Sequence, residues 1–277
     1  GAGGSQSSRA ATSTTSSLEL RGLRISDAVS PELAQLGRRE GPRALHGSLM
    51  AQGVLEPRGS QEDCVKGLQK LWESICQHND KIVKWRAEHA SWVREHAKWR
   101  EDNHGWEGTA DSMWEEAVNA AHDLQREDFA PDSLLEPSEP PKPTMDLLGC
   151  YIEGCRGSGK GLVVDLLTEC LGKEVRRTTL SGLLQDVQWP QQSHDVNDCQ
   201  EEAAREAIRG LALTTRLVVM ENVDVSDPMC ASLAKVFAEL FSEDIGAVVT
   251  SSLHHGEPDK DPFLKFLRSR GVSFHRL

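Results

Sequence analysis

The segment YIEGCRGSGKG at positions 151–161 carries glycines and a lysine at the spacing of a phosphate-binding loop, G-x-x-x-x-G-K. In such a loop, backbone N–H groups approach the phosphates, and the start of the following helix adds positive potential. The lysine neutralises the β- and γ-phosphates. We therefore predict a site for ATP or ADP made of eight consecutive residues, Gly154, Cys155, Arg156, Gly157, Ser158, Gly159, Lys160 and Gly161.

The positions that would support hydrolysis depart from this pattern. A Ser or Thr after the lysine gives its hydroxyl to Mg²⁺, whereas Gly161 has no side chain. A second strand should end in two carboxylates, but the strand predicted at 217–219 is followed by Met220, Glu221 and Asn222. In one register Glu221 is the metal ligand and Asn222 replaces the general base; in the other, Met220 replaces the ligand and Glu221 is the base. Mg²⁺ binding is therefore doubtful, with Glu221 as the one candidate ligand.

The end of the fourth predicted strand should supply a polar residue that senses the γ-phosphate. Thr250, Ser251 and Ser252 are the three candidates there. The chain stops at Leu277, directly after the fifth predicted strand, so we expect no helical lid domain. No residue is assigned as catalytic, and the substitutions together predict that hydrolysis has been lost.

Strands and helices alternate from residue 145 onward, and they must position this loop. The predicted strands are near-continuous apolar runs, which are typical of a parallel sheet covered on both faces. The helix after the loop is expected to end at Gly172, and a later helix to have Asp227 as its cap and Pro228 at its first position. The predicted fold is α/β: a five-stranded parallel sheet with helices on both faces, in the plan of an AAA+-like P-loop NTPase.

Composition divides the chain into four regions. Residues 1–45 form a polar extended arm rich in Gly, Ser and Arg, which resembles a transit-peptide remnant or a processed mature end; a plain disordered tail is the alternative. Residues 46–128 are predicted to be helical, with a long helix that begins near Ser60. Residues 129–144 form a Pro-rich linker, and residues 145–277 form the P-loop core.

The helical region carries tryptophans at heptad spacing, with histidines between them. They are Trp85, Trp92, Trp99 and Trp106. The stripe indicates a long amphipathic helix or a helical hairpin, and both packing within the chain and binding of a partner protein are open. We assign the four tryptophans as candidate partner-binding residues. His89 and His96 are two turns apart, about 10.5 Å along a helix, which argues against a metal site.

The overall composition limits the classes of function. The chain has 277 residues, of which 38% are hydrophobic and 27% charged, and its formal net charge is −12. This acidic balance argues against non-specific nucleic-acid binding. No run of about 18 apolar residues occurs, so no membrane span is predicted. The seven cysteines include no C-x-x-C pair, which favours buried thiols in a reducing compartment.

Four segments resemble the mitochondrial lactation-elevated AAA+ ATPases and their bacterial relative, the cell-division ATPase ZapE. They are residues 49–72, 140–167, 216–241 and 246–267, within a resemblance that covers 46–277. The tripeptide VSD at 225–227 resembles the family's V-T-D and sets the register. In that register the family's Asp-Glu pair falls on Glu221 and Asn222, its sensor Asn on Ser252, its next Arg on Leu253 and its loop Thr on Gly161.

The resemblance implies a location on the matrix side of the mitochondrial inner membrane. It leaves three hypotheses. The first is a pseudo-ATPase that serves as an accessory subunit of a large mitochondrial complex, with ATP synthase or the respiratory chain favoured over the ribosome. The second is an active ATPase that acts as a chaperone or quality-control factor for inner-membrane proteins. The third is an adaptor that senses nucleotide without turnover. The expected partners are protein subunits, without nucleic acid.

Overall fold

The structure is a computed structural model, and it describes residues 25–56, 58–102, 137–189, 198–252 and 261–277. The chain divides into two compact units. Unit 1 comprises Gly1–Cys76 and Met145–Leu277, and unit 2 comprises Gln77–Thr144. The predicted helical region 46–128 is therefore divided between the units, whereas the predicted start of the P-loop core at residue 145 coincides with a unit boundary.

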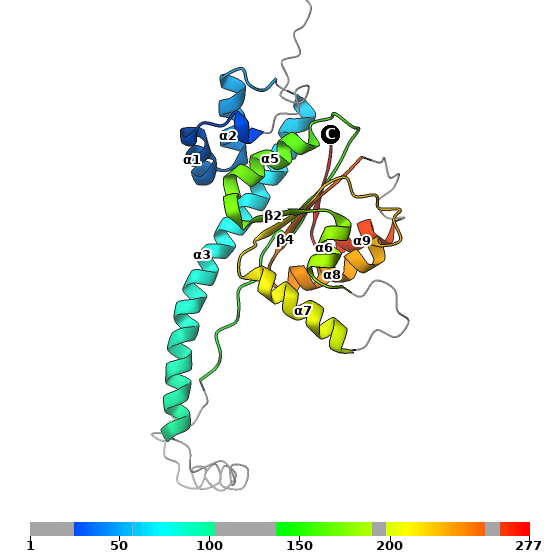
Figure 1. Ribbon diagram of the computed structural model, residues 1–277. Coiled ribbons are helices and arrows are strands. Elements are labelled where there is room, and N and C mark those ends of the chain that lie inside the picture. The colour runs from blue at the N-terminus through cyan, green and yellow to red at the C-terminus, as the bar shows by residue number, and fades with distance from the viewer. Residues whose placement is uncertain (1–24, 57, 103–136, 190–197, 253–260) are drawn as a thin grey trace, which may run out of the picture. The chain divides into compact units, whose positions relative to one another are not determined.

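Unit 1 is built on a parallel sheet (Figure 1). Its strands are β1 (Gly149–Glu153), β2 (Val175–Thr178), β3 (Leu217–Met220), β4 (Gly246–Ser251) and β5 (Ser273–Arg276). They lie in the order β2-β3-β4-β1-β5, and every pairing is parallel. All residues of β3 and β4 are buried, as expected for strands covered on both faces.

Helices precede and connect these strands. The described α-helices are α1 (Pro31–Glu40), α2 (Pro42–Ala51), α3 (Gly59–Asp102), α5 (Lys160–Leu171), α6 (Leu180–Asp186), α7 (Asp198–Ala212), α8 (Cys230–Ser242) and α9 (Pro262–Ser269). Gly172 ends α5 with a φ of 62°, as predicted. None of the described helices is both long enough and apolar enough to cross a membrane.

The two faces of the sheet have separate hydrophobic cores. Successive side chains of a strand point to opposite faces. Accordingly, Tyr151 of β1 packs in a cluster with residues of α6, α7, α8 and α9, whereas its neighbours Cys150 and Ile152 pack with α1, α2, α5 and the first turns of α3. Figure 1 shows the two groups of helices on opposite sides of the strands. This is the α/β P-loop NTPase fold that the sequence predicted.

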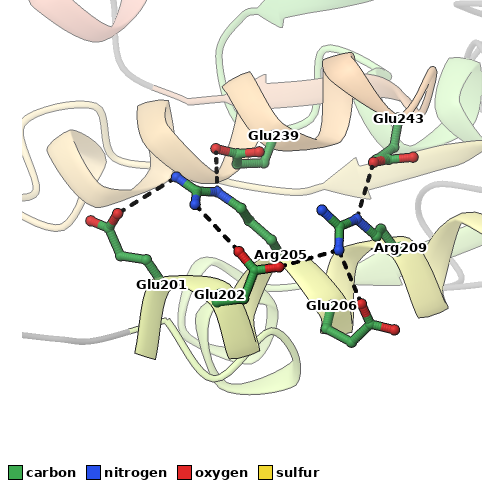
Figure 2. Close-up of polar contacts among 7 residues, drawn as sticks. All are labelled: Glu201, Glu202, Arg205, Glu206, Arg209, Glu239 and Glu243. Carbon is green, nitrogen blue, oxygen red and sulfur yellow. Dashed lines mark hydrogen bonds and ion pairs between the residues drawn. The ribbon is translucent and has the colours of Figure 1, made fainter. Parts of the chain in front are cut away.

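Helices α7 and α8 are also joined by charged side chains (Figure 2). Arg205 and Arg209 lie one turn apart on α7, and Arg205 Nε donates to Glu239 Oε1 of α8 at 3.3 Å. Arg209 faces Glu243 of α8, with 3.8 Å between Nε and Oε1. These side chains are partly exposed, so solvent screens the ion pairs, and apolar burial holds the layer together.

The prediction of an extended arm is wrong for residues 25–45, which contain α1 and the first turn of α2. Ser30 Oγ accepts a hydrogen bond from Leu33 N and caps α1, which has Pro31 at its first position. Leu33 and Leu45 are buried in the core that α5 covers. Within each helix the apolar residues recur at helical spacing, Leu33 and Leu36 in α1 and Leu45 and Leu49 in α2, and this pattern outweighs the polar composition of the region. Residues 1–24 lie outside the described residues.

Helix α3 begins at Gly59, which confirms the predicted start near Ser60. Helix α8 begins at Cys230 instead of Pro228, because the carboxylate of Asp227 accepts the Met229 N–H at 2.8 Å and closes a turn before the helix. Helix α6, capped by the side chain of Thr179, was not predicted.

Candidate nucleotide-binding site

The predicted loop connects the end of β1 to the first turn of α5. It lies at the carboxyl ends of the parallel strands, where ligands bind in open α/β sheets. Gly157 and Gly159 have φ values of 81° and 96°, which favour glycine. Gly154 is required for a different reason. A Cβ there would lie 2.6 Å from Ser158 Oγ and 2.7 Å from the carbonyl oxygen of Leu277. The backbone conformation of the loop therefore requires these three glycines.

Lys160 is held against its own loop. Its Nζ donates to the carbonyl oxygens of Gly154 at 2.7 Å and Cys155 at 2.8 Å, and the residue is 7% exposed. Burial lowers the pKa of Lys160 below its usual value, because desolvation disfavours the ammonium form. The partners that stabilise this charge are neutral carbonyls, so a more negative acceptor such as a phosphate oxygen can replace them.

The first turn of α3 also supports the loop. Gln61 is 4% exposed, and its Nε2 donates to the carbonyl oxygen of Ser158 at 3.3 Å. The contact joins residues 97 positions apart within unit 1. Gln61 therefore positions the loop.

Gly161 has no hydroxyl to offer a metal ion. A Cβ built on Gly161 meets no atom of the described residues within 4 Å, so a Ser or Thr side chain would have room here. Packing therefore does not require glycine at this position, and what the position lacks is the functional group.

Glu221, the one candidate metal ligand, faces a cation of the chain itself. It follows β3, and its Oε1 lies 3.6 Å from Nη1 of Arg177 on β2. Nη2 of the same guanidinium makes a close ion pair with Asp165 of α5. A carboxylate engaged by a guanidinium is a poor ligand for a divalent ion, because the two cations would repel each other. The residues present therefore do not fit Mg²⁺.

The positions predicted for water activation and γ-phosphate sensing contact each other. Ser252 Oγ donates to Asn222 Oδ1 at 3.2 Å, and the Asn222 N–H donates to Thr250 Oγ1 at 3.0 Å. Thr250 and Ser251 are buried, which leaves Ser252 as the exposed member of the three candidates. Neither Asn222 nor Ser252 offers a carboxylate to take a proton from water. Leu253 lies outside the described residues.

Gln61, Asp165 and Arg177 are site residues that the sequence analysis missed. For Arg177 a signal was present. Strands of a covered parallel sheet are normally apolar, and two consecutive arginines in β2 break that pattern. A charged residue in such a strand indicates a partner of opposite charge. For Gln61 and Asp165 the sequence offers no comparable signal.

In unit 2, the tryptophan stripe contacts its own chain. Trp85 Nε1 donates to the carbonyl oxygen of Pro140 at 2.9 Å, and Trp92 Nε1 to that of Pro137 at 2.7 Å. The ring of His89 lies between the two indoles and is tilted against both, with ring centroids 4.9 and 5.4 Å away. Packing within the chain, one of the two interpretations left open, thus describes Trp85 and Trp92.

The ring of His96 lies between those of Trp92 and Trp99, with centroid distances of 4.9 and 6.1 Å. Trp106 lies outside the described residues. Within the described part of the chain, no group of three or more His, Cys, Asp or Glu side chains is arranged to hold a metal ion.

No protein-family model and no curated protein sequence matches the chain. Several solved structures are similar to part of it. AMPPCP-bound DnaA from Aquifex aeolicus shares 15% identity over 48% of this chain and 41% of that chain, with a TM-score of 0.32. Domain III of the Thermotoga maritima replication initiation protein DnaA shares 18% over 48% and 55%, with a TM-score of 0.33.

A structure described as a DNA replication initiation factor shares 14% identity over 48% of this chain and 40% of that chain, with a TM-score of 0.33. The chain thus spans between 40% and 55% of the length of these structures. At such identities and TM-scores no activity is carried over from them. The fold assignment rests on the sheet order and the loop described above.

Proposed function

We propose that this chain is a nucleotide-binding pseudo-ATPase, which holds ATP or ADP in its P-loop and does not hydrolyse it. One observation carries the proposal. The loop is complete as a phosphate cradle, with Lys160 in place, whereas the position of the general base is Asn222, whose side chain bonds Ser252. An amide does not take up a proton from water near neutral pH, so the chain can bind nucleotide without activating water.

The loop and Lys160 would hold the phosphates. A bound nucleotide supplies negative charge and oxygen acceptors. Lys160 can exchange its two carbonyl acceptors for phosphate oxygens, and its burial strengthens that interaction. The backbone N–H groups at the start of α5 add donors and a favourable dipole. Gln61 keeps the loop in position through Ser158.

The test is protection of the folded chain by ATP or ADP against heat. Saturation at about 100 times the dissociation constant stabilises a protein by about 2.7 kcal/mol, which is a shift of several degrees in Tm. We expect this shift in the wild type and in Lys173→Ala, which changes an exposed lysine near α5. Lys160→Ala should lose it. Absence of protection in the wild type by either nucleotide would contradict the proposal.

We further propose that the chain acts as an accessory subunit of a large mitochondrial complex on the matrix side of the inner membrane, with ATP synthase or the respiratory chain as the first candidates. The support is its resemblance to a mitochondrial AAA+ family and the degenerate positions Gly161 and Asn222, which favour a structural role over turnover. Its net charge of −12 favours protein partners over nucleic acid.

Native gel electrophoresis of gently solubilised mitochondrial membranes tests this assignment. Co-migration with one large complex at constant stoichiometry is the expected result. Migration alone or as a small ring would overturn it and favour the free ATPase chaperone.

A further inference from the structure

Arg177 contacts Glu221, the one candidate ligand for a divalent cation. It is the third residue of β2 and pairs in register with Val219 of β3. Its guanidinium contacts Asp165 of α5 and Glu221 after β3, so two carboxylates from different parts of the chain converge on one positive charge of β2. Glu221 is the carboxylate on which a metal ion would depend.

Two further observations show that this charge is built into the site. Asp165 lies five residues after Lys160, on the helix that the loop opens, and its side chain is 18% exposed. It holds the guanidinium even if Glu221 moves toward another partner. Arg177 Nε is buried and has no hydrogen-bond partner among the described residues. The two carboxylates therefore engage only part of the five-donor guanidinium.

We infer that Arg177 takes the place of the divalent cation, and that this chain binds ATP or ADP as the metal-free anion. The inference rests on the proposed nucleotide binding. A guanidinium is always charged and matches phosphate oxygens with a planar set of donors, so it can supply part of the charge compensation that Mg²⁺ gives elsewhere. Gly161, which offers no hydroxyl to a metal, agrees with this substitution.

The test is titration calorimetry of the full chain with ATP and with ADP, in excess Mg²⁺ and in excess chelator. We expect the two dissociation constants for each nucleotide to agree within about twofold. A dissociation constant lower by about tenfold or more in Mg²⁺ would overturn the inference while leaving nucleotide binding intact. Absence of binding under both conditions would overturn the proposed function, and the inference with it.

Two neighbouring arginines provide a matched pair of variants. Arg177→Met should raise the dissociation constant in chelator by about tenfold, which corresponds to loss of one charge-assisted contact. Arg176→Met should leave it unchanged, because Arg176 contacts Asp186 instead. Equal affinity of wild type and Arg177→Met in chelator would overturn the inference.

If Arg177 is only a structural bridge, Arg177→Met should lower the free energy of unfolding without changing the effect of Mg²⁺ on nucleotide affinity. Arg177→Lys keeps the charge and should retain part of the metal-free binding. If Arg177→Met does not fold, as judged by circular dichroism, the Mg²⁺ dependence of the wild type decides the matter.

Discussion

Two glycines of the same loop have opposite structural requirements. Gly154 lies against Ser158 Oγ and the Leu277 carbonyl oxygen, where a methyl group would collide. Gly161 faces open space. At the scale of single residues, a loop motif therefore contains positions set by backbone packing and positions set by chemistry. Only the first kind constrains the fold.

Substitution of these two glycines should give opposite results. Gly161→Thr should leave the free energy of unfolding unchanged or raise it by roughly 0.3 kcal/mol, because Thr is a better helix former than Gly. Gly154→Ala should lower it by more than about 1 kcal/mol, because the new methyl group meets backbone. Chemical denaturation measures both. Equal destabilisation would contradict the described loop path.

A buried histidine predicts a pH dependence of stability. His46 is buried, its Nε2 has no hydrogen-bond partner among the described residues, and desolvation lowers its pKa below the ordinary value of 6.5. The unfolded chain therefore binds this proton more readily than the folded chain. The stability that neutral His46 contributes is present above the pKa that this histidine has in the unfolded chain, and it is lost as the pH falls below that pKa.

We expect the denaturant concentration at the unfolding midpoint to decrease when the pH is lowered from about 7 to about 5. The decrease should be smaller in His46→Leu, which removes the group that must be protonated. Burial also lowers the pKa of His275, so this residue keeps part of the pH dependence in the variant. Identical pH profiles for the two proteins would show that His46 does not contribute.

At the scale of elements, unit 2 joins a helix to an extended Pro-rich segment through matched repeats. Seven helical residues rise about 10.5 Å, which is about the greatest length that three residues of extended chain can span. Trp85 and Trp92 are seven apart and meet the carbonyls of Pro140 and Pro137, which are three apart. The heptad of tryptophans thus fits a three-residue spacing of acceptors.

Trp92→Phe should test this pairing, because it keeps an aromatic ring and removes the N–H donor. We expect a loss of about 1 kcal/mol in local stability, typical of one hydrogen bond. Hydrogen exchange of the Ser138 and Glu139 amides should become faster. Val93→Ala, at an exposed neighbouring position, should leave exchange unchanged. Unchanged exchange in both variants would contradict the contact.

The sequence predicted the elements better than their contacts. The strands and the loop are local patterns, apolar runs and glycine spacing, so they could be recognised without tertiary information. The contact of Arg177 with Glu221 depends on β2 lying beside β3, and the sequence alone did not give that order. Helix α1 and the first turn of α2 were not predicted, because the polar composition of residues 1–45 outweighs the few leucines that these helices bury.

At the scale of the whole molecule, the chain combines a P-loop unit with a unit that contains a tryptophan-lined helix. In unit 1 the phosphate cradle is present, while the positions for metal binding and water activation carry Gly161 and Asn222, and Glu221 is engaged by Arg177. We therefore place the function of unit 1 in holding nucleotide.

A single-turnover assay with γ-labelled ATP, excess protein and Mg²⁺ tests this central claim most directly. The account predicts that the chain retains ATP and that the nucleotide recovered from it is unhydrolysed. Mg²⁺-dependent release of labelled phosphate by the wild type, abolished in Lys160→Ala, would show an active ATPase and contradict the account.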